Sequence, residues 1–444
     1  MQQMKHMRMK NIILFSLLLL ITISCEKKSE EKPLDKLVQS LEKELNPLSE
    51  NPLLWSDNDL KFLDPIARNS IIGLGEATHG TAEFSRSKHR IFKYLIENHN
   101  YKIFAFETDF GESLLINEAI QKGDSSSIEN LMKTKMHFWT WRTEEVKDLL
   151  VWMCTYNLNK SAEEKVQYMG VDCQFNTFNP DMVKEYLSKT GAPFYSYAES
   201  ILNEAKNASK ESFKSYSQEI FNNYLKQIDD LQDSVVAHKN KLIQASSEKQ
   251  YLLYERILEI VRQVSVQGYY YQKQDYSINY RDQYMAENAA WLLDYFDGKK
   301  VVIWAHNGHI ANDPKYIGLG YNLNRKMANN YATIGFLFSK GTFTARGMEG
   351  DQITDIKEHV IDLDPKENSI NFVMTQSKES VFSVRVGYLQ NYREWNEAFA
   401  NKMQYFQIGA VFNNLPQAYY SVFSPTFFDY IIYFDRSTAS VILQ

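Results

Sequence analysis

The sequence predicts an α/β fold in which a mainly parallel central sheet is flanked by helices. Short apolar runs alternate with segments of helical periodicity, the pattern of successive strand–helix–strand units. Polar residues follow the ends of four of these runs, where a parallel sheet places its ligands. One long segment, about 179–297, is polar and helical throughout. It predicts a large helical insertion that covers the carboxyl edge of the sheet.

The N-terminus has the composition of a secretory signal. Basic residues precede a short apolar run that ends at a cysteine: Lys5, Arg8, Lys10, residues 12–23 and Cys25. This order predicts a bacterial lipoprotein signal in residues 1–24, with Cys25 as the lipidated residue and 25–33 as a charged tether. An ordinary signal peptide or a short membrane anchor is the alternative. We therefore expect a lipid-anchored protein of the bacterial cell envelope.

Composition narrows the class of partner. The chain has 444 residues, of which 44% are hydrophobic and 23% charged, and a net charge of −6. No basic stripe or basic domain is present, which argues against a nucleic-acid partner. Beyond Cys25 the chain has Cys154 and Cys173, whose spacing matches no zinc motif. We expect them to be two buried thiols.

The first strand of the core ends in a short motif. Residues 70–74 are apolar, and Gly-Glu-Ala-Thr-His-Gly follows at 75–80. Glycines after a buried strand predict a tight turn into a helix, here residues 82–98. The turn presents Glu76 and His79, and the helix carries Arg86 and Lys88 near its start.

Other expected strands end in similar residues. Residues 101–108 end in Glu107, 166–171 are followed by Asp172, and 300–305 are followed by His306 and His309. The remaining expected elements are helices at 34–45, 113–121 and 143–157, strands at 332–338, 381–386 and 430–434, and 341–346 as the hairpin partner of 332–338. An aromatic cluster that includes Trp141 precedes the helix at 143–157. In the last helix of the insertion, the apolar stripe through Met285 and Ala289 extends back to Arg281.

Because parallel strands end at one edge, the four strand ends predict a shared polar site. Three imidazoles with two or three carboxylates suit two chemistries. One is metal-assisted hydrolysis, and the other is metal-free acid–base hydrolysis by an imidazole. The sequence contains no G-x-S-x-G elbow, so a serine mechanism of the α/β-hydrolase type has little support. Spacing alone does not separate the two remaining chemistries.

Three ordered motifs, Gly75–Thr81, Phe104–Glu107 and Trp304–His309, resemble the erythromycin esterase family. The Asp172 strand end and the segment from Arg281 to Met285 are similar to that family too. The resemblance covers about Leu60 to the C-terminus. It implies an α/β core with helical additions and a hydrolase that opens macrolide lactones with no required metal or other cofactor.

The resemblance also implies roles for the motif residues. His79 is expected to be the general base and Glu76 its support, while Glu107, His306 and His309 complete the site and stabilise the oxyanion. A basic residue in the following helix also matters in the family, and Arg86 and Lys88 are both candidates. Asp172, Arg281 and Trp141 are the further substrate-binding candidates.

The substrate stays open at this point. A small-molecule ester or a macrolactone is the expected partner, and hydrolysis of a macrolide would confer antibiotic resistance. An envelope position fits interception of a macrolide and hydrolysis of other esters equally well. Two alternatives remain: a non-catalytic surface lipoprotein that binds a ligand in the same cleft near Trp141, and a metal-dependent hydrolase that uses the same histidines and carboxylates.

Overall fold

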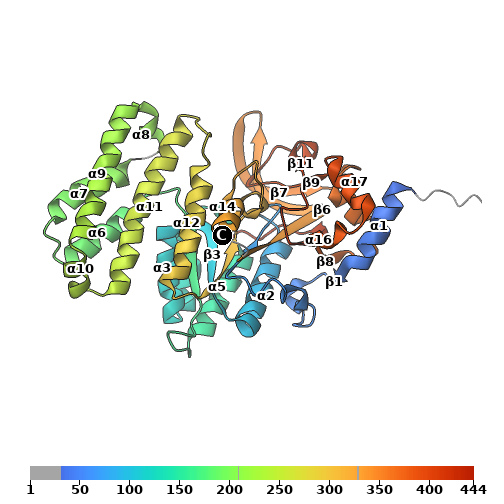
Figure 1. Cartoon of the computed structure of the whole chain (residues 1–444), viewed down its shortest axis with the longest axis horizontal. Coiled ribbons are helices and arrows are strands. Elements are labelled where there is room, and N and C mark those ends of the chain that lie inside the picture. The colour runs from blue at the N-terminus through green and yellow to red at the C-terminus, as the bar shows by residue number, and fades with distance from the viewer. Residues whose placement is uncertain (1–31, 209, 328–329) are drawn as a thin grey trace, which may run out of the picture.

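The computed structural model describes residues 32–208, 210–327 and 330–444 (Figure 1). The expected signal segment, Cys25 and most of the tether lie outside the described residues. Within them, no helix is long and apolar enough to cross a membrane. Helix α1 (Pro33–Glu44) confirms the expected entry helix.

A ten-stranded mixed sheet forms the centre of the molecule. Its main order is β1-β8-β12-β6-β2-β5-β3-β4, with β7 and β10 paired to β6, and a small second sheet joins β9 and β11. Within this sheet, β4, β3, β5, β2, β6 and β12 run parallel to one another. The strands are β1 (Leu45–Pro47), β2 (Ile71–Leu74), β3 (Tyr101–Asp109), β4 (Gln167–Asp172), β5 (Lys300–Trp304), β6 (Tyr331–Glu349), β7 (Gln352–Ile361), β8 (Val381–Arg385), β9 (Gln404–Phe406), β10 (Val411–Phe412), β11 (Tyr420–Val422) and β12 (Tyr430–Ser437). The predicted α/β class with a mainly parallel sheet is confirmed.

The expected hairpin at 341–346 is wrong. These residues continue β6, and the antiparallel partner of that strand is β7, which follows a turn at Gly350. Gly341 lies within the strand and has a positive φ of 114°. A Cβ there would meet the backbone oxygen of Ser437 at 2.2 Å, so the glycine serves the close approach of β12 rather than a reversal.

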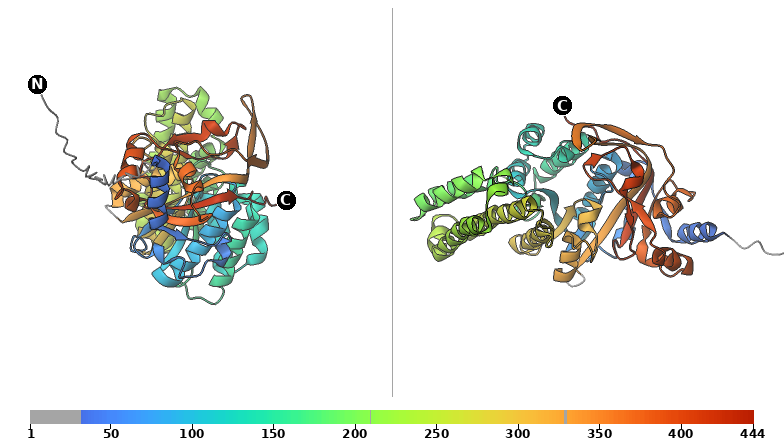
Figure 2. Two further views of the ribbon diagram at one scale, coloured as in Figure 1. Left: turned by 90° about the vertical axis from the view of Figure 1, so that its right-hand side faces the viewer. Right: turned by 90° about the horizontal axis from the view of Figure 1, so that it is seen from above.

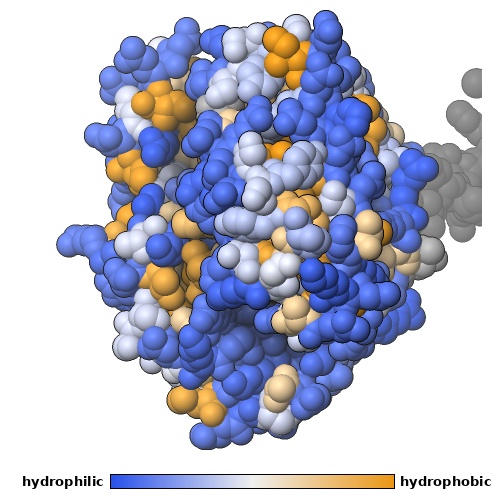
Figure 3. Space-filling model, turned by 90° about the vertical axis from the view of Figure 1, so that its left-hand side faces the viewer, coloured by the Kyte–Doolittle hydropathy of each residue, from blue (hydrophilic) through white to orange (hydrophobic). Residues whose placement is uncertain are grey.

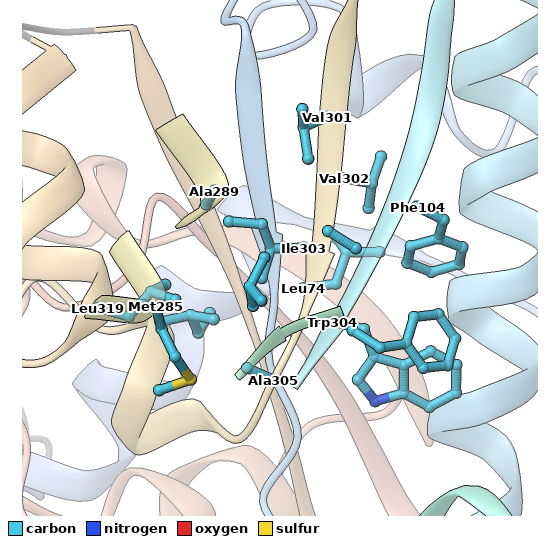
Figure 4. Packing of buried hydrophobic residues seen from close by; sticks show 14 of the residues in the cluster. Leu74, Phe104, Met285, Ala289, Val301, Val302, Ile303, Trp304, Ala305 and Leu319 are labelled. Carbon is cyan, nitrogen blue, oxygen red and sulfur yellow. The ribbon is translucent and has the colours of Figure 1, made fainter. Parts of the chain in front are cut away.

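Helices cover the sheet and extend beyond it. Those outside the insertion are α2 (Ala82–His99), α3 (Phe110–Lys122), α4 (Ile128–Lys135), α5 (Glu144–Asn157), α13 (Asn307–Ile310), α14 (Leu319–Met327), α15 (Ile370–Thr375), α16 (Val386–Leu389) and α17 (Arg393–Ala400). Figure 4 shows the packing that fixes the parallel strands: Met285, Ala289 and Leu319 lie to one side of Ile303, and Phe104 and Trp304 to the other. All of these side chains are essentially buried. This core holds the strand ends in place.

The segment 179–297 is helical, as expected. It forms α6 (Asn179–Lys189), α7 (Tyr195–Asn207), α8 (Lys210–Ser215), α9 (Gln218–Ala237), α10 (Lys239–Ala245), α11 (Glu248–Gln272) and α12 (Tyr280–Tyr295). Seen from above, most of these helices project from the sheet at the end opposite α1 (Figure 2). Their outer surface is mainly hydrophilic with small separate apolar patches (Figure 3). Side chains at the start of α12 bond to residues at the strand ends.

Candidate active site

The sheet order brings the predicted strand ends together. Strands β2, β5, β3 and β4 are consecutive neighbours and parallel, so their carboxyl ends form one edge. The residues delivered to that edge are Glu76, His79, His306, His309, Glu107 and Asp172. The rings of His79 and His306 lie 5.2 Å apart between centroids. Six of the residues singled out from the sequence therefore share one site.

Close backbone contacts hold the turns after β2 and β5 against each other. The Asn307 backbone N–H donates to the Glu76 carbonyl at 2.9 Å, and the Asn307 side chain bonds both backbone groups of Phe336 in β6. A Cβ on Gly75 would meet the Asn307 side-chain oxygen at 2.1 Å. Glycine is required there because the two turns touch, and this contact fixes the backbone position of the neighbouring Glu76.

Glu76 is a buried carboxylate with three partners. It bonds the Nδ1 of His79 at 2.6 Å, the Nζ of Lys88 at 2.5 Å and the indole N–H of Trp304 at 2.6 Å. Burial raises the pKa of a carboxyl, but the neighbouring Lys88 and His79 outweigh it and lower the pKa of Glu76 to about 2. Glu76 is therefore ionised at neutral pH and holds the His79 ring by one nitrogen.

The structure distinguishes the two basic candidates on α2. Lys88 is fully buried beneath Glu76, and its Nζ lies 4.2 Å from the centre of the Trp304 ring. Burial lowers the pKa of Lys88 to about 8, a fall that the Glu76 carboxylate limits. Arg86 points elsewhere and pairs with Glu145 at 3.4 Å. Lys88 thus supports the site from below, and Arg86 lies outside it.

The three imidazoles differ in which ring nitrogens have hydrogen-bond partners. His306 accepts the Gly308 N–H at Nδ1 (3.1 Å), and its Nε2 lies 2.9 Å from the Ile408 carbonyl, to which it must donate. Burial, followed by the charges of His79 and His309, lowers the pKa of His306 to about 4. His306 is a neutral imidazole with both nitrogens in use. His79 uses Nδ1 for Glu76, and no described residue hydrogen-bonds its Nε2.

His309 lies between two carboxylates. Its Nδ1 is 2.7 Å from Asp282 and its Nε2 is 3.2 Å from Glu107. Burial lowers the pKa of an imidazole, but Asp282 and Glu107 outweigh it and raise the pKa of His309 well above its usual value. A doubly protonated ring can donate to both carboxylates, so the 3.2 Å approach of the Arg281 guanidinium to Nε2 is a contact between two cations.

Arg281 joins the last two strand ends. Its guanidinium forms a two-point contact with Asp172, with Nε to Oδ1 at 3.0 Å and Nη2 to Oδ2 at 2.6 Å. The same Nη2 donates to Glu107 at 2.7 Å. Burial raises the pKa of Glu107, but His309 and Arg281 outweigh it and hold that pKa well below its usual range. Arg281 therefore has the buried partners that its place on the apolar stripe of α12 required.

Two residues fall differently from the sequence expectation. Trp141 is buried, packs against Phe106 and Trp304, and donates its indole N–H to the Glu107 carbonyl, so it presents no face to a ligand. Asp282 was not among the candidates, although it follows Arg281 directly. An acidic residue in the first turn of a helix ordinarily interacts with the helix dipole, so Asp282 carries no separate functional signal in the sequence. Cys154 and Cys173 are buried and unpaired, as expected.

A cleft opens beside the His309 end of the site. It has a volume of about 530 Å³, and Arg281, Asp282 and Tyr316 line its inner side. Gln267, Tyr276 and Ile278, from the end of α11 and the turn before α12, also line it. The Tyr316 and His309 ring centroids are 6.3 Å apart, so the cleft adjoins the strand ends.

The described residues contain no arrangement of side chains that matches a metal site. Among them, no group of three or more His, Cys, Asp or Glu side chains is placed to hold a metal ion. A guanidinium stands between Glu107 and Asp172, and both nitrogens of His309 face carboxylates. Glu107, Asp172 and His309 therefore already have protein partners where a cation would bind.

Comparison with known proteins identifies the family. The erythromycin esterase family matches residues 96–437, well over half of the chain. The protein belongs to the erythromycin esterase family, as the three motifs predicted.

Individual relatives are distant. YbfO of Bacillus subtilis (strain 168) is 27% identical over 302 residues, which is 64% of this chain and 64% of YbfO. The erythromycin esterase type II of Escherichia coli is 27% identical over 327 residues, covering 66% of this chain and 75% of its own length. A solved structure of a mutant of the erythromycin esterase EreC in its open conformation superposes with a TM-score of 0.65 at 13% identity. It covers 87% of this chain and 95% of that one, and it shows a common fold.

Proposed function

We propose that the protein is a carboxylic ester hydrolase that uses His79 as a general base toward water. The observation that carries this proposal is the difference among the three imidazoles. His306 and His309 have both nitrogens engaged, whereas His79 is held at Nδ1 by an ionised Glu76 and has Nε2 without a partner among the described residues. An imidazole positioned by a carboxylate at one nitrogen can accept a proton at the other.

The steps follow from the positions of the charges. Water loses a proton to Nε2 of His79, and its oxygen attacks the ester carbonyl to form a tetrahedral oxyanion. Glu76 stabilises the imidazolium that results, while the positive charges of His309 and Arg281 favour the oxyanion. When the oxyanion collapses, the bond to the alcohol oxygen breaks and that oxygen takes the proton from His79. The products are a carboxylic acid and an alcohol, and in a lactone both are on one molecule.

The substrate proposal extends to macrolactones. It is supported by family membership and by similarity to the erythromycin esterase type II of Escherichia coli. Its test is incubation of the purified protein with a macrolide panel and with p-nitrophenyl esters, followed by mass spectrometry for the addition of one water. Hydrolysis by the wild type but not by His79→Ala supports the proposal. No hydrolysis of any lactone or aryl ester contradicts it.

We also propose that the protein is a lipoprotein of the bacterial cell envelope anchored through Cys25. The support is the order of basic residues, apolar run and cysteine in the sequence. Metabolic labelling with a fatty-acid analogue tests it: the wild type should be labelled and Cys25→Ser should not. Labelling of both proteins, or of neither, contradicts the proposal.

A further inference from the structure

The cleft beside His309 contains an unsatisfied hydrogen-bond donor. Gln267 of α11 lines the cleft and is only 6% exposed, yet its Nε2 has no hydrogen-bond partner among the described residues. Buried polar atoms in proteins are nearly always paired, because an unpaired one loses its bonds to water without replacement. A ligand oxygen in the cleft would supply the missing acceptor.

The walls of the cleft suit an amphipathic group. The rings of Tyr270 and Tyr280 stack at 4.6 Å between α11 and α12, which lie side by side in Figure 1. Tyr276 is 68% exposed and Ile278 is 47% exposed, so apolar surface faces solvent at the outer side. Large exposed apolar side chains gathered at a cleft provide area that a ligand can cover.

The charges in the cleft favour an uncharged ligand. Arg281 and Asp282 line it, but they are occupied by Asp172, Glu107 and His309. The other charged lining residues are Lys315 and Asp275, which are exposed and of opposite sign. No net charge therefore selects an anion or a cation, and the buried selecting group is a neutral amide.

We infer that this cleft is a specificity site for the part of the substrate that does not react. It takes an uncharged acyl or alcohol portion that carries ether, hydroxyl or carbonyl oxygens on an apolar frame. Gln267 donates to one of those oxygens, and Tyr276 and Ile278 cover the frame. The inference rests on the proposed ester hydrolysis. Arg281 and Tyr316 connect the cleft to the strand ends, where His79 lies, so a substrate whose ester is at the strand ends can extend into the cleft.

The test compares two esters of equal length. One is p-nitrophenyl 2-(2-methoxyethoxy)acetate, which has two ether oxygens, and the other is p-nitrophenyl heptanoate, which has none. The wild type should prefer the ether ester in kcat/KM, and Gln267→Leu should reduce that preference about three- to tenfold, the scale of one neutral hydrogen bond. The matched control is Gln250→Leu, at an exposed position on the same helix, which should keep the wild-type ratio. A ratio of rates is insensitive to a general loss of folded protein.

Failure of the two proposals can be distinguished. If the wild type cleaves both esters and Gln267→Leu leaves their ratio unchanged, the specificity site is wrong and the hydrolase proposal stands. If the wild type cleaves neither of these esters and no member of the macrolide panel, the hydrolase proposal is wrong, and calorimetric titration with the amide analogue of the ether ester then tests whether the cleft binds a ligand. Binding that weakens about three- to tenfold in Gln267→Leu supports a binding site there, and equal or undetectable binding in both proteins overturns it.

Discussion

The two sides of the site use the same residue types to opposite effect. On the His79 side, Glu76 is paired with the buried ammonium of Lys88, and the nearby His306 is neutral. On the His309 side, the carboxylates of Glu107, Asp172 and Asp282 surround one guanidinium and one imidazole. The number of carboxylates per fixed cation differs between the sides, and the carboxylates of Asp282 and Glu107 raise the pKa of His309.

In the proposed hydrolysis, we infer a different chemical role for each side from this difference. Glu76 has a fixed cation, so it orients the His79 ring without requiring it to be charged, and the free Nε2 can accept a proton. The carboxylates of Asp282 and Glu107 raise the pKa of His309 and so favour its protonated form. In the proposed reaction this imidazolium stabilises the negative charge of the oxyanion and is a poor base. A site that must both remove a proton and stabilise an oxyanion at one pH benefits from two imidazoles held in different states.

Removing the ring on the basic side should have the largest effect. We expect His79→Ala to lower ester hydrolysis by about two to four orders of magnitude, the usual contribution of a general base. The far-UV spectrum and the unfolding midpoint should stay close to those of the wild type, since His79 lies at the surface of the site. His99→Ala, which changes a histidine at the far end of α2, is the control and should retain full activity. Equal loss in both variants would contradict the assignment.

The cation beneath Glu76 should be the next most sensitive element. Lys88→Met leaves a buried carboxylate without its cation, and losing one partner of a buried pair costs about 3–5 kcal/mol of unfolding free energy. Urea unfolding measures it. Lys122→Met, which removes an exposed lysine of an i,i+4 pair with Glu118, should change the unfolding free energy little. A small loss for Lys88→Met would show that Glu76 becomes protonated or hydrated at little cost.

The sequence was sufficient to predict which residues meet but not their charge states. Apolar runs ending in Glu76, Glu107, Asp172 and His306 predicted the shared edge, because parallel strands leave no other arrangement. The partners of each ring depend on segments far away in the chain. Ile408 lies 102 residues beyond His306 and bonds its Nε2, and Lys88 reaches Glu76 only because α2 packs with that side inward.

The sequence was also misleading at two kinds of position. Residues 341–346 were interpreted as the hairpin partner of 332–338, but they continue β6, and Gly341 permits the close approach of β12 instead of lying beside a reversal. Trp141 was interpreted as a ligand platform because aromatic clusters mark both cores and binding surfaces, and here the indole is buried under β3 and β5. Asp282 was missed because one carboxylate beside Arg281 has no periodic pattern of its own.

Lowering the pKa of His309 should shift the pH dependence of ester hydrolysis. Asp282→Asn removes a negative charge next to His309 and so lowers the pKa that Asp282 and Glu107 raise. The imidazolium is then lost at a lower pH, and the alkaline limb of the kcat/KM profile should shift to lower pH. Because the folded pKa is the raised one, the stability gained from charging His309 is complete below its unfolded pKa and is lost as pH rises through the folded value.

The comparison variant for Asp282 is Glu287→Gln on the same helix, where the carboxylate accepts only from Gln283 at the surface. Among the described residues Glu287 makes no contact with His309, so the pH profile of this variant should coincide with that of the wild type. An Asp282→Asn profile that also coincides with the wild type would show that hydrolysis does not depend on a charged His309.

The smallest effect should come from Arg86, which the sequence could not separate from Lys88. Arg86 lies on α2 only two residues before Lys88, but it faces Glu145 at 3.4 Å and is partly exposed. Arg86 is only partly buried and lies 3.4 Å from the buried Glu145, a longer contact than that of Lys88 with Glu76, so Arg86→Ala should lower the unfolding free energy less than Lys88→Met does and leave hydrolysis unchanged. Kinetic assay of Arg86→Ala beside Lys88→Met, each corrected for its folded fraction, measures the contrast. A tenfold or greater loss of kcat/KM in Arg86→Ala would place substrate on the outer face of α2 and contradict the site at the strand ends.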